Sequence, residues 1–79
     1  GEIVERIRRR GEEVPGVLAI EKLAVRRAGM VLFVEIHVQA AGTMSLDEAH
    51  RLGGKVKSAI REEVKEVGGV TVHMEPYGE

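Results

Sequence analysis

Aliphatic residues occupy every second position from Leu32 to Val38, and the positions between them are Phe33, Glu35 and His37. Such alternation indicates a β-strand whose two faces meet different surroundings, because successive side chains of a strand point to opposite sides. The aliphatic face should lie against helices, which leaves His37 on the opposite, more polar face. The chain is therefore expected to build a sheet that is covered on one face only.

Two other segments have the periodicity of amphipathic helices. Residues 2–12 place apolar side chains on one arc and charged ones on the rest. The second segment begins at Ser45 and Glu48, which form the pattern of a capping box, in which each residue satisfies a backbone N–H group of the other. Its apolar stripe continues to Gly68 and Gly69, and this glycine pair is expected to end the helix.

The remaining segments are rich in β-branched and aliphatic residues. Residues 17–27 and 30–40 are expected to form a hairpin that turns at Ala28 and Gly29, and residues 70–76 a last strand. The order helix, strand, strand, helix, strand predicts an α+β fold, a ferredoxin-like two-layer sandwich with a three-stranded sheet and two helices on one face. The last strand is expected to lie beside the first, reached by a crossover connection.

Length and composition limit the possible functions. With 79 residues the chain is one small domain, for which oligomerisation or a bound metal would be a useful source of extra stability. It has no cysteine, so any metal must be held by histidine and carboxylate groups. A net charge of -1, with one Tyr and one Phe, argues against nucleic-acid binding. No apolar run is long enough to insert into a membrane, and the start without Met indicates a piece of a longer protein.

His73 and Glu75 are the first candidates for a metal site. Residues two apart in a strand share a face, so the two side chains project together, on the same open face as His37. Two imidazoles and a carboxylate suit Zn²⁺, which usually takes four ligands. Glu21 is a further candidate, because residues 17, 19, 21 and 23 share one face of the first strand. The phase of that strand relative to the helices is left open by the sequence.

Each of these residues also has a simpler interpretation. A single surface histidine is usually solvated rather than bound to metal, and this holds above all for His50, in the second turn of the long helix and off the centre of its apolar stripe. The basic run of residues 6–10 is interspersed with glutamates, which is typical of a solvated helix face. No arrangement of Ser, His and Asp suggests a nucleophile, so the chain is not expected to be an enzyme.

An ordered set of short motifs resembles the cytoplasmic C-terminal domain of cation diffusion facilitator transporters, over nearly the whole chain. The motifs are Val14-Pro15-Gly16-Val17, the strand that ends in Leu23-x-Val25-Arg26, Glu35-Ile36-His37-Val38, Ser45-Leu-Asp-Glu-Ala49-His50 and Val72-His73-Met-Glu75-Pro76. The resemblance implies a metallochaperone-like fold, here without the CxxC of copper chaperones. It also implies a homodimer with Zn²⁺, or Cd²⁺ or another divalent transition metal, at the dimer interface.

The family pattern places metal ligands at His37, His50, His73 and Glu75, with Glu21 where relatives often have a further histidine. His50 is expected to reach a site shared with the other subunit. The domain would be covalently linked to a transmembrane transporter domain in the plasma (inner) membrane, and metal binding would draw the protomers together and promote cation efflux.

A different class of function is also compatible with the residues. The open sheet face could pair with another sheet in a ferredoxin-like ligand-sensing or assembly module whose histidines are incidental. Such a module would dimerise whether or not a chelator is present, whereas metal-dependent assembly would not.

Overall fold

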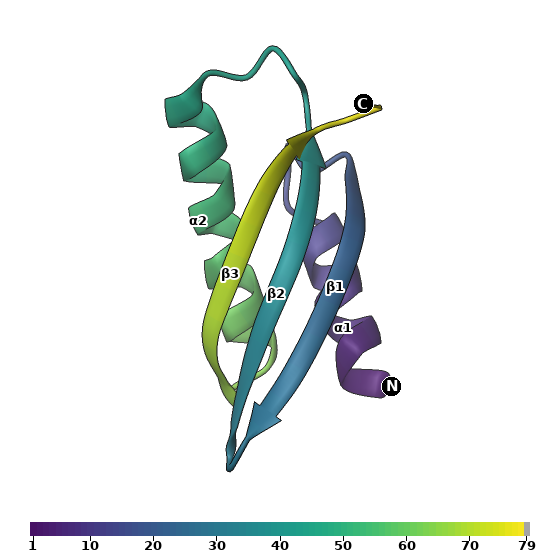
Figure 1. The fold of residues 1–79 in the computed structure, drawn as a ribbon, viewed down its shortest axis with the longest axis vertical. Helices are drawn as coiled ribbons and strands as arrows, with labels where there is room; N and C mark the ends of the chain where they lie inside the picture. Colours follow the sequence, from purple (N-terminus) through teal and green to yellow (C-terminus); the bar gives the residue numbers. More distant parts are fainter. Residues whose placement is uncertain (79) are drawn as a thin grey trace.

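A computed structural model describes residues 1–78 and contains two helices and three strands. In chain order the elements are α1 (Glu2–Glu12), β1 (Ala19–Ala28), β2 (Val31–Ala40), α2 (Leu46–Glu63) and β3 (Val67–Pro76). Both helices cover the same face of the sheet, and the other face is open (Figure 1). The predicted order, the three-stranded sheet and the two-layer sandwich are confirmed.

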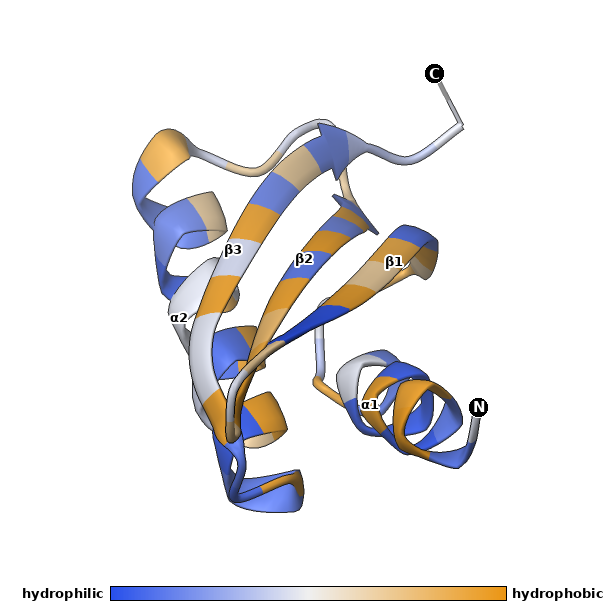
Figure 2. Cartoon of the chain, turned by 60° about the horizontal axis from the view of Figure 1, so that its bottom comes forward, coloured by the Kyte–Doolittle hydropathy of each residue, from blue (hydrophilic) through white to orange (hydrophobic). Residues whose placement is uncertain are grey.

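The core lies between the helices and the covered face of the sheet, where the alternation of β2 predicted it. Ile36 and Val38 are 0% exposed, and so are Ile7 of α1 and Val56 and Ile60 of α2. Figure 2 shows the matching alternation of apolar and polar residues along the strands. Full burial of one such side chain contributes about 1.5–3 kcal/mol, so this small set supplies much of the favourable free energy of folding.

The position of β3 in the sheet differs from the prediction. The sheet order is β1-β2-β3, with β1 antiparallel and β3 parallel to β2, so the last strand lies beside the second strand and not beside the first. The segment from β2 through α2 to β3 is thus a crossover between neighbouring parallel strands, the usual outcome for consecutive strands joined by a helix. β2 becomes the central strand, which agrees with the nearly complete burial of its aliphatic face.

The end of α2 also differs from the prediction. The helix ends at Glu63, Val64 is already extended, and Gly68 and Gly69 belong to β3. Neither glycine has a positive φ. A Cβ on Gly69 would lie 3.1 Å from Phe33 Cδ1, and one on Gly68 would collide with Val31. The pair therefore serves the close approach of β3 to β2 at a register shift and not the end of a helix.

Two local predictions, the hairpin turn and the capping box, are confirmed. The hairpin turns at Gly29, whose φ of 63° lies in the left-handed region that glycine adopts without strain. At the start of α2 the side chain of Ser45 accepts a hydrogen bond from the Glu48 N–H, and the Glu48 carboxylate accepts one from the Ser45 N–H. No helix among residues 1–78 is long and apolar enough to cross a membrane.

Candidate metal centre

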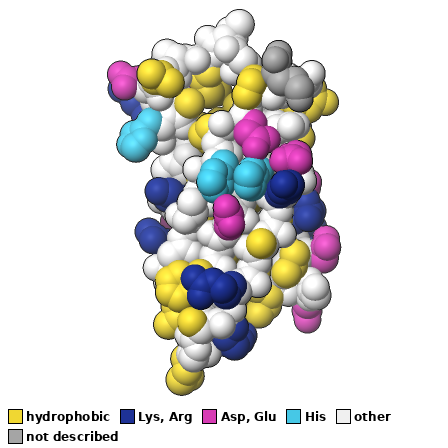
Figure 3. All heavy atoms as spheres, viewed as in Figure 1, with side chains coloured by type: hydrophobic (Ala, Val, Ile, Leu, Met, Phe, Trp, Pro, Cys, Tyr) yellow, Lys and Arg dark blue, Asp and Glu magenta, His cyan; other side chains and the backbone are white. Residues whose placement is uncertain are grey.

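The parallel pairing of β2 with β3 brings two histidines together on the open face. In this register His37 lies beside His73, and Gln39 lies beside Glu75. The two imidazole rings stack with their centroids 4.4 Å apart and their planes 14° from parallel. Figure 3 shows the two rings side by side among acidic side chains in the middle of this face, with the third histidine of the chain apart from them.

A β-bulge in β1 brings Glu21 to the same face. Ile20 pairs with Val38 but Lys22 pairs with His37, so Glu21 is the extra residue of the bulge. Ile20 before the bulge is buried, and Leu23 after it packs against the core, so the covered face passes from even to odd positions at this point. The prediction that residues 17, 19, 21 and 23 share one face is therefore wrong: Leu23, and Val17 just before β1, pack against the core, whereas Glu21 does not.

The bulge explains how Glu21 can point away from the core while Leu23 points toward it. A strict period of two would have placed both side chains on one face. Because the extra residue resets the alternation, Glu21 faces His37, and its Oε1 lies 3.9 Å from His37 Nδ1.

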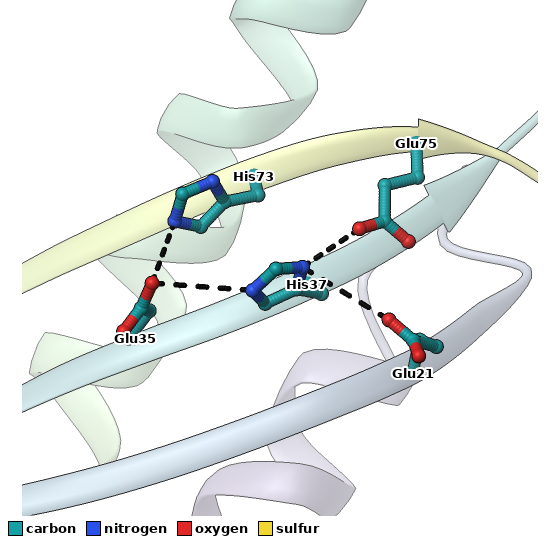
Figure 4. Close-up of polar contacts among 5 residues, drawn as sticks. All are labelled: Glu21, Glu35, His37, His73 and Glu75. Atoms are coloured by element: carbon teal, nitrogen blue, oxygen red, sulfur yellow. Dashed lines mark hydrogen bonds and ion pairs between the residues drawn. The ribbon is translucent and has the colours of Figure 1, made fainter.

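Polar contacts link five side chains from the three strands (Figure 4). His37 Nδ1 lies 2.7 Å from an oxygen of Glu75, and His37 Nε2 lies 3.9 Å from Glu35 Oε2. The same Glu35 oxygen lies 2.9 Å from His73 Nε2. Every ring nitrogen of His37 thus faces a carboxylate, and three carboxylates surround two imidazoles.

The environment favours the charged form of one of these carboxylates. The hydrogen bond with His37 lowers the pKa of Glu75 below its usual value, against the smaller opposing effect of desolvation. His37 is the least exposed member, with 21% of its side chain accessible, whereas Glu35 is 55% accessible. The centre of the cluster is therefore partly shielded from solvent and its rim is open to it.

The donor set fits a divalent transition metal. Two groups, each with ligand atoms within 4.8 Å of one another, are Glu21, His37 and Glu75, and Glu35, His37 and His73. Imidazole nitrogens and carboxylate oxygens are zinc donors with bond lengths of about 2.0–2.2 Å, so the side chains of either group would have to close in around an ion. Such sets also suit other ions of the divalent series.

Four of the five predicted ligands, Glu21, His37, His73 and Glu75, come together in this cluster, and His50 does not join either group. His50 lies on α2 and is exposed. Glu35, by contrast, contacts both imidazoles although it was not among the predicted ligands. Its position two residues before His37 in β2 was the available signal, since the two residues share a face.

Residues 1–77 match the family described as cation efflux protein, cytoplasmic domain. The chain belongs to this family. It is 33% identical over 76 residues to the cation-efflux pump FieF of Shewanella oneidensis, and 33% identical over 73 residues to metal tolerance protein C1 of Arabidopsis thaliana. These matches cover 91% and 92% of the chain but only 24% and 16% of the relatives, so the chain spans about a quarter or less of their length.

Solved structures of the MamM CTD have the same fold. The MamM CTD of residue range 215–293 superposes with a TM-score of 0.91 at 21% identity, covering 95% of both chains. The cadmium form of a MamM CTD variant superposes with the same TM-score, 0.91, at 23% identity, covering 95% of this chain and 94% of the other. The metallochaperone-like fold expected from the family resemblance is confirmed. The family and the two relatives are described as cation efflux or metal tolerance proteins, and none of these descriptions names an enzyme.

Proposed function

We propose that this chain is the metal-binding regulatory domain of a divalent-cation efflux transporter, and that Zn²⁺ is its ligand. The observation that carries the proposal is the convergence of Glu21, His37 and Glu75 from three different strands on one point of the open face. Membership of the cation efflux family supports a role in cation transport. The relatives' greater length supports a covalent link to a transmembrane domain, with this domain on the cytoplasmic side.

His37 is the anchor of the proposed site. It is the most buried of the five side chains, it lies on the central strand, and both of its ring nitrogens face carboxylates. Glu75 and Glu21 face the Nδ1 atom from the two flanking strands. His73 lies against His37 on the β3 side. Solved structures of the MamM CTD include zinc, cadmium and manganese forms, which supports a divalent ion at a domain of this fold.

The acidic character of the cluster suggests how metal could be coupled to assembly. Glu21, Glu35 and Glu75 lie together on the open face, so a second copy that approaches with the same face would meet like charges. A bound divalent cation supplies positive charge among them. We propose that the domain forms a homodimer, that His50 reaches a site shared by the two copies, and that metal-bound closure promotes transport.

The size of the effect follows from the preference of metal for the closed state. A ligand that binds one of two states about 100-fold more tightly shifts their equilibrium by about 2.7 kcal/mol. A shift of this size converts a minor state into the major one, so moderate selectivity of the site would suffice for regulation.

Calorimetric titration with Zn²⁺ tests the binding step. The double variant His73→Ala with Glu75→Ala should lose most of its zinc affinity, while Glu12→Ala, a carboxylate change on α1, should bind as the unmodified chain does. Equal zinc binding by the double variant and the unmodified chain would contradict the assignment.

Sedimentation with Zn²⁺ and with EDTA tests the assembly step. Metal-dependent closure predicts a dimer, or a more compact dimer, with zinc and its loss with the chelator. Assembly that is indifferent to EDTA would instead support an assembly module whose histidines are incidental.

A further inference from the structure

Glu35 has a position in the cluster that differs from those of the other two carboxylates. Its Oε2 atom lies 2.9 Å from His73 Nε2 and 3.9 Å from His37 Nε2, so a single oxygen faces the same nitrogen of both rings. Glu21 and Glu75 face His37 Nδ1, on the other side of that ring. The Nδ1 side of His37 thus has two carboxylates, and the Nε2 side has Glu35.

The stacking of the rings argues against Glu35, His37 and His73 as a chelating set. The ring planes are 14° from parallel and their centroids are 4.4 Å apart. The lone pair of an imidazole nitrogen lies in the plane of its ring, so the lone pairs of two stacked rings run side by side and do not converge. An ion equidistant from both Nε2 atoms would lie between the two planes and outside each of them.

A hydrogen bond suits this arrangement better. At 2.9 Å the Glu35 carboxylate can accept the proton of His73 Nε2–H without any movement of the stack. Figure 4 shows the other ring nitrogen of His73 on the side of the ring away from Glu35. A histidine that donates one ring N–H to a carboxylate keeps its other nitrogen free as a ligand, and such outer carboxylates fix both the tautomer and the ring orientation.

We infer that Glu35 is a positioning residue and not a ligand: it holds His73 as the Nε2–H tautomer, so that Nδ1 is the atom His73 offers to a divalent metal ion. Because the lone pairs of the stacked rings do not converge at Nδ1 either, this ion is a different one from the ion proposed at His37 Nδ1. This inference rests on the proposed function for its metal. It adds the role of each nitrogen of His73 and separates Glu35 from the ligands Glu21 and Glu75.

The tautomer can be measured without metal. In ¹⁵N NMR spectra of the metal-free protein, recorded at a pH where the imidazoles are neutral, His73 should carry its proton on Nε2. Glu35→Ala should convert His73 to a mixture of tautomers, and Glu35→Gln, which keeps an acceptor oxygen, should preserve most of the Nε2–H form. Glu12→Ala is the control and should change nothing. An unchanged tautomer in Glu35→Ala would overturn the inference.

Zinc affinity and the visible spectrum of bound Co²⁺ distinguish positioning from direct ligation. Loss of an outer carboxylate costs about 10–100-fold in metal affinity, so Glu35→Ala should bind zinc that much more weakly and Glu35→Gln should recover part of the loss. The Co²⁺ spectrum should keep its shape in both variants, because the ligands are unchanged. Equal losses in the two variants with a changed Co²⁺ spectrum would show that Glu35 is a ligand and would overturn the inference.

The two measurements separate this inference from the proposed function. If the unmodified chain bound neither Zn²⁺ nor Co²⁺, the proposed function would fail, and the metal-dependent part of the inference would fail with it. If the unmodified chain bound zinc and only the tautomer result were negative, the role of Glu35 would fail and the proposed function would stand.

Discussion

His37 and His73 stack face to face because parallel strands place them at the same level of the sheet, with ring centroids 4.4 Å apart. Thirty-five residues, which include all of α2, lie between the two histidines in the sequence. Their contact nevertheless depends on a single feature, the register of β3 against β2. A shift of that register by one residue would turn one ring toward the core. The site therefore depends on the same pairing that places Ile36 and Val72 on the covered face.

The first prediction concerns the unequal roles of His37 and His50. His37→Ala should reduce zinc affinity by more than the roughly 100-fold seen for outer residues of metal sites, because it removes the proposed central ligand. His50→Ala should change the zinc affinity of the isolated protomer by no more than a few-fold, because His50 lies outside the cluster. The same variant should weaken zinc-dependent dimerisation about tenfold or more, as the loss of a metal-site residue does in other proteins. Calorimetry at low protein concentration and sedimentation over a concentration range measure the two effects.

The opposite pattern would contradict the proposed site. If His50→Ala abolished zinc binding at concentrations where the protein is monomeric while His37→Ala did not, the cluster on the open face would not be the metal centre. Lys57→Ala, an exchange of a basic residue on the same helix as His50, is a suitable control.

Much of the fold could be predicted from the sequence, because its signals are local. The alternation in β2, the capping box at Ser45 and the turn at Gly29 each depend on neighbouring residues alone. The order of strands in the sheet could not be predicted in this way, since it depends on how α2 returns the chain to the sheet. The role of Gly68 and Gly69 was hidden for the same reason, because it depends on the distance to β2.

The candidate site could be predicted in part. Strand parity was enough to bring His37, His73 and Glu75 to one face, since each lies in a regular stretch of strand. The orientation of Glu21 was ambiguous because a bulge interrupts the period of two at that residue. The grouping around His37 also required the register between β2 and β3, which no local pattern encodes.

The second prediction compares two glycines, one with free space beside its Cα and one packed tightly against a neighbouring strand. Gly54 lies inside α2 with open space where a Cβ would be, so Gly54→Ala should stabilise the fold by about 0.5–1 kcal/mol. At Gly68 a Cβ would collide with Val31, so Gly68→Ala should destabilise by about 1–3 kcal/mol. Urea unfolding of each variant measures both changes. If Gly68→Ala were as stable as the unmodified chain, the close packing of β3 on β2 would be wrong.

The third prediction concerns pH and the start of α2. The backbone hydrogen bond from Ser45 lowers the pKa of Glu48, so ionised Glu48 stabilises the helix start. A lowered pKa in the folded state means that this contribution is complete above the ordinary carboxyl value of about 4.3 and is lost as the pH falls through the lowered pKa. Glu48→Ala should therefore be less stable than the unmodified chain near neutral pH, and the difference should shrink in acid.

Asp47→Ala is a matched control for this prediction, because Asp47 is also acidic and in the first turn of α2 but is not part of the capping box. The comparison separates the hydrogen bond from the general effect of negative charge at a helix N-terminus. Unfolding curves at about pH 7 and at about pH 3 give the difference in stability between each variant and the unmodified chain at both pH values. Identical behaviour of the two variants would mean that the capping hydrogen bond contributes nothing of its own.

The fourth prediction is that zinc raises the thermal stability of the domain, and that its removal lowers it. A ligand that binds only the folded state, at a free concentration about 100 times its dissociation constant, stabilises by about 2.7 kcal/mol. In a domain of this size 1 kcal/mol corresponds to about 4–8 °C, so the Tm should rise by roughly 10–20 °C. EDTA should reverse the rise completely. His37→Ala should melt at the same temperature with and without zinc, and a similar zinc-dependent rise in that variant would place the bound ion elsewhere on the molecule.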